Sequence, residues 1–405
     1  MKLTTIGRIL CCLAGFSCSA ALLQSQTAPL FPPQQLARIQ QGLREIYSLE
    51  YDRAARDFQV MIREAPEDPA GYAYLAMTYW IEELGRKQEL SIDRFAASDF
   101  FVENPRHRPK ADPAVAARFQ QASERAVEKA RARLSKNPGD RAALFLRGLA
   151  NQNLASFELS QQNWLRAYKY GGQTLRDHEQ LLRRDPAFPD AKLSIGVCDY
   201  VAGSLPWTFR WIAVLFGHPG SKERGRLALE AAAEKGVLVA DEARVVLILV
   251  YTYEKRYEKA ARLLSELHQK YPRNYMAHLD MGGMALLMNQ PDKAIAIYED
   301  IIEKREAKEP KYDELQRAAL YNRLGVAFRK KGDLDAATGA FRKALSEEGL
   351  SSRSATIARL ELGKTLDLMG ARAEALKNYQ QVIAAEDYAG SRTEAENLQR
   401  RPFRN

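Results

Sequence analysis

The sequence is poor in the residues that metal sites and thiol chemistry require. Of 405 residues, four are cysteine and five are histidine. Cys11, Cys12 and Cys18 lie near the start of the chain, which leaves Cys198 alone after residue 28 and excludes an internal disulfide there. No histidine stands at a metal-ligand spacing from another histidine or a cysteine. We therefore predict no metal and no cofactor.

Familiar catalytic motifs are absent as well. The chain contains no HExxH, CxxC, P-loop or GxSxG pattern. The glycine pairs Gly171-Gly172 and Gly282-Gly283 lack the preceding strand that a phosphate-binding loop needs. We predict no catalytic residue and favour a binding protein over an enzyme. The enzyme alternative is a helical hydrolase or lyase whose residues meet only in the fold.

The chain also lacks a strong excess of one charge. Its formal charge is +9, and 51 acidic residues are interspersed among 60 basic ones. Removal of Lys2 and Arg8 with the N-terminal segment would leave +7. No basic run is interleaved with aromatic residues that could stack on bases, so we expect no nucleic-acid partner.

Residues 1–28 are typical of an export signal. Two basic residues precede an apolar stretch at residues 9–23, and Ser19-Ala20-Ala21 provides small residues for cleavage after Ala20 or Ala21. The stretch is shorter than the about 20 residues of a membrane-spanning helix. We expect a periplasmic or secreted protein. The alternatives are an uncleaved anchor and a lipoprotein attached at Cys18, although Gly15 occupies the position where a lipoprotein signal has an aliphatic residue.

Helical repeats are the main feature that is present, since strand signals are nearly absent. One repeat is marked by Tyr321, Leu324, Gly325, Phe328, Ala337, Phe341 and Ala344, the next by Leu362, Gly363, Leu366, Ala375 and Tyr379, and earlier ones by Gly282, Ala285, Ala294 and Tyr298, by Tyr251, Ala260, Leu264 and Pro272, and by Gly42, Ala54, Phe58 and Pro66. This pattern resembles the tetratricopeptide repeat (TPR), two antiparallel helices in about 34 residues. The resemblance implies an all-α, TPR-type α-solenoid of stacked helical hairpins with irregular central insertions.

The predicted organisation has five parts. They are a signal peptide and cleavage region (1–28), N-terminal helical repeats with an insertion at 91–113 (29–140), a central helical region with an apolar, tryptophan-rich segment (141–240), a C-terminal TPR array (241–388) and a polar tail (389–405). The cysteine of the mature chain, Cys198, falls in a central helix, where we expect it to act as a small hydrophobic side chain.

Two irregular segments carry apolar side chains whose role has more than one interpretation. Phe100 and Phe101 in the first insertion either pack on the array or form a lid over its groove. The second segment contains Trp207, Phe209, Trp211 and Phe216. It is a plug inside the superhelix, an exposed patch for a partner, or an element that rests on a membrane surface.

The central region shows a second resemblance. The order Gly196, Ser204-Leu205-Pro206, Leu215-Phe216-Gly217, Arg224-Gly225 and Leu229, followed by TPR units, resembles the inclusion-body-clearance/tetratricopeptide-repeat-39 family over residues 192–298. Those are helical repeat proteins associated with the clearance of protein inclusions and lipid-linked traffic, and they have no attributed enzymatic activity. Two features of this sequence differ from that family: the export signal and the stretch Ser221-Lys222-Glu223-Arg224. We therefore carry over only the architecture.

A solenoid of this type has a long inner surface that suits protein or peptide segments. Candidate partner-binding residues are Arg244, Tyr251, His278, Asn322 and Arg323, with an ordinary solvated helix face as the alternative. The sequence therefore predicts an exported scaffold or adaptor that holds a protein segment in its concave groove. The alternative is a carrier or receptor for a lipid or another apolar ligand near residues 203–217.

Overall fold

The chain is built from paired helices. The computed structural model describes residues 29–86, 92, 111–161, 163–186, 188–204, 220–388 and 390–404. These residues form 17 α-helices, one 3-10 turn and no strand. The predicted all-α, TPR-type solenoid is therefore confirmed. The predicted signal and the aromatic side chains Phe100, Phe101, Trp207, Phe209, Trp211 and Phe216 lie outside the described residues.

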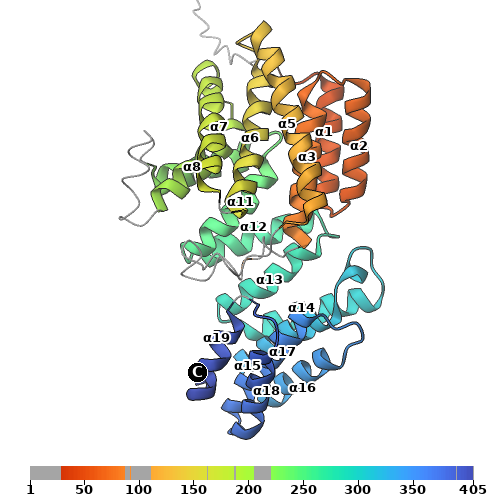
Figure 1. Ribbon diagram of the computed structural model, residues 1–405, viewed down its shortest axis with the longest axis vertical. Helices are drawn as coiled ribbons and strands as arrows, with labels where there is room; N and C mark the ends of the chain where they lie inside the picture. Colours follow the sequence, from red (N-terminus) through yellow and green to blue (C-terminus); the bar gives the residue numbers. More distant parts are fainter. Residues whose placement is uncertain are drawn as a thin grey trace, which may run out of the picture.

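Each helix packs against the next one along the chain, as in a stack of hairpins. The pairs are α1 (Pro33–Tyr47) with α2 (Tyr51–Glu64), α3 (Pro69–Arg86) with α5 (Pro113–Lys136), α6 (Arg141–Ser160) with α7 (Trp164–Arg184), α8 (Ala191–Ser204) with α10 (Lys222–Lys235), α11 (Ala240–Tyr253) with α12 (Tyr257–Lys270), α13 (Tyr275–Leu287) with α14 (Pro291–Glu306), α15 (Arg317–Lys331) with α16 (Leu334–Ser346), and α17 (Ser352–Leu368) with α18 (Arg372–Ala384). The turn η2 (Tyr312–Glu314) precedes α15, and α19 (Ser391–Arg400) follows α18 (Figure 1).

A glycine and an aromatic ring hold the two helices of several hairpins together. Each glycine precedes its ring by 16 residues, and a Cβ atom on the glycine would overlap the ring. The pairs are Gly42 with Phe58, Gly282 with Tyr298, Gly325 with Phe341, and Gly363 with Tyr379. All four rings are buried. The close approach of the helices therefore depends on glycine, and the ring on the second helix occupies the space that a side chain would fill.

In the third hairpin a histidine takes the place of that ring. His178 on α7 lies against Gly148 on α6 and stacks on Phe145 with ring centroids 5.6 Å apart. Its Nε2 is 3.2 Å from the Phe145 carbonyl oxygen. Burial lowers the pKa of His178, so the neutral ring is favoured. These two helices have 20 and 21 residues.

The first five hairpins close on themselves. The turn between α1 and α2 lies against the turn between α12 and α13, more than 220 residues later in the chain. Arg273 Nη1 is 2.9 Å from Glu50 Oε1, Asn274 Nδ2 donates to the Tyr47 carbonyl over 2.8 Å, and the rings of Tyr47 and Tyr271 are 5.5 Å apart. One continuous apolar core accordingly extends from Phe31 to Met284, whereas the later hairpins have smaller cores of their own.

The C-terminal residues contain a helix rather than only a polar tail. Ala395 on α19 is fully buried in the core formed with α17 and α18. Arg372 Nη2 donates to the carbonyls of Leu398 and Gln399 over 2.8 and 2.7 Å, which satisfies two acceptors at the end of α19. The stack therefore continues beyond residue 388, and α19 forms its last layer.

Candidate partner-binding face

Three of the five residues predicted to bind a partner are buried. Tyr251, His278 and Asn322 are each 5% exposed. The Tyr251 hydroxyl donates to Glu230 Oε1 over 2.6 Å, and burial together with this bond raises the pKa of Tyr251 to about 12. The Asn322 amide donates to the Ser354 carbonyl over 3.1 Å. These side chains join neighbouring helices instead of presenting a free surface to a partner.

The two predicted cations are also held within the array. Arg244 Nη1 lies 2.7 Å from Asp241 Oδ1, and its side chain is 25% exposed. Lys270 and Tyr271 contact the other oxygen of the same carboxylate. Arg323 is half-buried on α15. Neither cation is an isolated charge that a partner's carboxylate could neutralise alone.

His278 belongs to a polar cluster that joins four elements, α12, α13, α14 and η2. Its ring stacks on His268 of α12 at 4.3 Å, its Nδ1 is 3.1 Å from the Tyr312 hydroxyl of η2, and its Nε2 is 3.5 Å from Asp300 Oδ2. Burial and the neighbouring His268 lower the pKa of His278 to about 4. Within the part of the chain that the structure describes, no group of three His, Cys, Asp or Glu side chains is arranged to hold a metal ion. The contacts of His278 therefore connect neighbouring helices.

Another surface is formed by one side of α15 and α17, which we call the inner face. Apart from Ile357, its side chains are partly or fully buried. Asn322, Val326 and Arg329 follow one another at i, i+4 and i+7 on α15, and Ile357, Glu361 and Lys364 do the same on α17. The two rows lie next to each other, because Asn322 contacts the backbone of Ser354 and Arg329 forms an ion pair with Glu361. Ile357, an apolar side chain at one end, is 37% exposed.

Fixed charges occupy the other end of the inner face. Lys364 Nζ is 2.8 Å from Glu361 Oε1 and 2.6 Å from Glu394 Oε1 on α19. Burial alone would raise the pKa of Glu361, but Lys364 and Arg329 outweigh that effect and hold the pKa below its ordinary value. Glu361 is therefore charged at neutral pH, and the network fixes α15, α17 and α19 relative to one another.

The end of the chain lies on this charged part of the inner face. The Phe403 ring is centred 5.4 Å from the Arg329 guanidinium carbon and 5.8 Å from Lys364 Nζ. Its backbone N–H donates over 2.8 Å to Asp367 Oδ2, and the Asp367 side chain has no exposed surface. Sequence reasoning missed Phe403. The available signal was a single aromatic residue among the arginines that follow the last helix.

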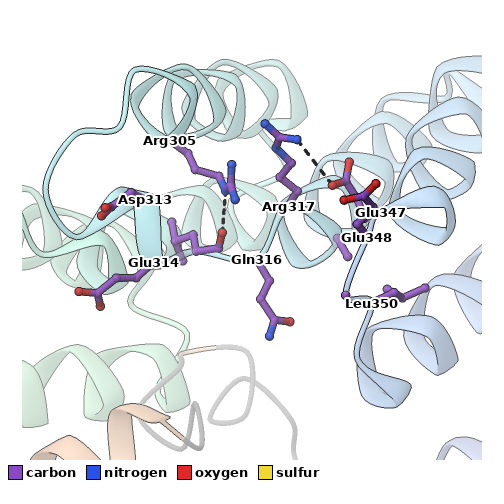
Figure 2. A pocket seen from close by; sticks show the side chains of 11 residues that line it. Arg305, Asp313, Glu314, Gln316, Arg317, Glu347, Glu348 and Leu350 are labelled. Carbon is purple, nitrogen blue, oxygen red and sulfur yellow. Dashed lines mark hydrogen bonds and ion pairs between the residues drawn. The ribbon is translucent and has the colours of Figure 1, made fainter.

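A depression in the surface lies between the turn before α15 and the turn before α17 (Figure 2). It has a volume of about 360 Å³ and a mostly charged lining. Arg305 Nε donates to the Leu315 carbonyl over 2.6 Å, and Arg317 forms a two-pronged pair with Glu306 as well as a 4.0 Å contact with Glu347. Both arginines of this depression therefore hold internal partners.

Residues 251–319 match the family described as tetratricopeptide repeat. No curated protein sequence matches the chain. Similar solved structures include yeast Tom70 (TM-score 0.39, 13% identity, 91% of this chain and 95% of that chain) and human IFIT1 dimer with m7Gppp-AAAA (0.41, 14%, 91% and 87%). Another is a Rap protein complexed with competence and sporulation factor (0.41, 12%, 91% and 98%).

The family match and the stacked hairpins identify TPR-type helical repeats. The narrower resemblance to the inclusion-body-clearance family stays a prediction. Among the described helices, none combines the length and apolar character that crossing a bilayer requires.

Proposed function

We propose that this protein is an exported TPR scaffold that binds an extended protein segment along the inner face of α15 and α17. The observation that carries the proposal is the position of Phe403 on the inner face. An extended stretch of polypeptide already lies there, with its aromatic ring over two cations and its backbone N–H on a buried carboxylate. Aromatic anchoring combined with backbone hydrogen bonding is a general mode of peptide recognition.

The chemistry of the face suits binding rather than catalysis. Arg329, Glu361 and Lys364 are locked in mutual ion pairs, so they provide orientation and fixed charge. Ile357 adds an exposed apolar contact at the far end of the same row. A partner segment that runs along the two helices would therefore meet an apolar position first and an aromatic-binding position next.

Site-specific crosslinking in the native host tests this binding surface. We would replace Ile357 by p-benzoylphenylalanine in the full chain and irradiate the cells. The matched control places the same residue at Gln380, an exposed position on α18. We expect one or a few proteins to become attached at position 357 and not at 380. Equal labelling at both positions, or labelling at 380 alone, would contradict the assignment of the binding face.

Export is a separate part of the proposal and has a separate test. Mass spectrometry of the chain purified from its native host gives the mature N-terminus. Cleavage after Ala20 or Ala21 predicts a chain that starts at Ala21 or Leu22. A lipid-modified chain that starts at Cys18 would establish the lipoprotein alternative, and an intact chain that starts at residue 1 would contradict cleavage.

A further inference from the structure

The last residues of the chain occupy a surface that is well suited to another polypeptide. The contacts of Phe403 with α15 and α17 are those that a bound peptide would make, yet they are supplied by the protein's own end. On both sides of Phe403 the residues Arg401, Pro402 and Arg404 are exposed. A short apolar cleft of about 490 Å³ lies beside them, between α19 and the chain end.

We propose that residues 401–404 are a resident, displaceable ligand of the inner face, and that the partner is an extended protein segment that presents an aromatic residue there. This inference builds on the function proposed above. It assigns the chemistry of the partner from the ring and backbone contacts of Phe403, and it makes the free binding site a minor state of the intact protein.

The receiving site does not depend on the segment that fills it. Asp367 accepts hydrogen bonds from Arg372 Nη1 over 2.9 Å and from the Tyr379 hydroxyl over 2.9 Å, so its carboxylate is fixed without Phe403. Lys364 and Arg329 are fixed by Glu361 in the same way. Departure of the tail therefore leaves a preorganised site for an aromatic ring and an N–H group.

The hold on the tail is weaker than the hold on the helix before it. Helix α19 is anchored by the buried Ala395 and by the two hydrogen bonds from Arg372. After Arg400, the contacts described above come from Phe403 alone, whose side chain is half-buried. Residues 401–404 can therefore leave while α19 stays docked. A tethered segment has a local concentration on the order of millimolar, so an external segment competes poorly until the tail is displaced or removed.

Peptide titration tests the inference. The probe is a fluorescein-labelled peptide with the sequence of residues 399–405, measured by fluorescence anisotropy against the mature full chain and against the chain ending at Arg400. We expect binding to the shortened chain at least tenfold tighter than binding to the full chain, because the site is no longer occupied. A peptide with alanine in place of its phenylalanine should lose this binding.

Point variants of the full chain separate release of the tail from damage to the fold. Phe403→Ala should raise affinity for the peptide toward that of the shortened chain. Arg404→Ala, which changes an exposed neighbour, should keep the weak binding of the parent. Circular dichroism and hydrogen-exchange protection of α17 and α19 would verify that each variant is folded.

Two results would overturn the inference. One is the absence of peptide binding to the folded, shortened chain at peptide concentrations up to about 1 mM. The other is equal binding to the shortened and full chains, which would place the peptide elsewhere. Both differ from failure of the proposed function, which the crosslinks at position 357 report without the peptide.

Discussion

The contact between Gly325 and Phe341 predicts that Gly325→Ala destabilises the protein when residue 341 is phenylalanine and stabilises it when residue 341 is leucine. A Cβ atom at Gly325 would lie 2.6 Å from Phe341 Cε1 and 2.7 Å from Cζ. Overpacking of this kind destabilises by about 1–3 kcal/mol, while alanine favours a helix over glycine by up to about 1 kcal/mol. Gly325→Ala alone should therefore lower the stability of this hairpin by about 1 kcal/mol.

A second substitution, at Phe341, removes most of the overlap with a Cβ atom at position 325. Phe341→Leu deletes the two closest ring atoms and by itself should destabilise by about 1–3 kcal/mol. In that background only the position of Cδ1, 2.8 Å from the new methyl group, is still filled, and the leucine side chain can turn away from it, so Gly325→Ala should now stabilise by up to about 1 kcal/mol. The control is Gly339→Ala on α16, where a Cβ atom would meet nothing within 4 Å. It should stabilise by about 0.5–1 kcal/mol in both backgrounds.

Native-state hydrogen exchange of α15 and α16 is the suitable assay, since an array of this length does not unfold in one two-state step. A change of 1 kcal/mol in local opening corresponds to about a fivefold change in exchange rate. The reasoning fails if Gly325→Ala destabilises equally with phenylalanine and with leucine at position 341. It also fails if Gly339→Ala shows the same dependence on residue 341.

Three further predictions concern the closure of the array and its buried titratable groups. Asn274→Ala removes both the cap of α13 and the bond to Tyr47, so the free energy of local opening of α1 and α13, measured by hydrogen exchange, should fall by about 1–2 kcal/mol. Arg273→Ala loses an exposed ion pair with Glu50 and should change this free energy by less than about 1 kcal/mol. Burial raises the pKa of Glu242 from 4.5 to about 7, so its contribution to stability is lost as the pH rises through that value. Glu242→Gln should therefore raise the melting temperature more at pH 8 than at pH 5, and an equal change at both would contradict the shift. Since the pKa of His278 is lowered to about 4, its NMR signal should stay unchanged between pH 7.5 and 5.5 in the folded protein but titrate near 6.5 in urea.

The sequence predicted the helical hairpins, because the contacts that form each hairpin lie within one short stretch of the chain. Gly282, Gly325 and Gly363 mark first helices, and the aromatic residues 16 positions later mark second helices, because both sides of each contact lie in one hairpin. The family match to residues 251–319 includes one of these pairs, Gly282 with Tyr298. The pattern was harder to follow in the third hairpin, where His178 replaces the aromatic ring and the helices are longer.

The candidate site was less predictable because it depends on how successive hairpins are placed. Periodicity assigns Asn322 to a face of its own helix, but only the position of α17 determines that this amide reaches the Ser354 carbonyl and is buried. The chain end has a similar explanation. Helix α19 and Phe403 are held by Arg372 and Asp367, and such polar contacts leave no apolar period in residues 391–404.

The contact between the α1–α2 turn and the α12–α13 turn also restricts how this protein can evolve. Open solenoids gain and lose repeats readily, since each unit needs only its neighbours. Insertion or loss of one hairpin between α2 and α12 would carry Asn274 away from Tyr47 and separate the two turns. Repeat number is therefore fixed in the first part of the chain, and variation in length among descendants should be confined to the hairpins after α13.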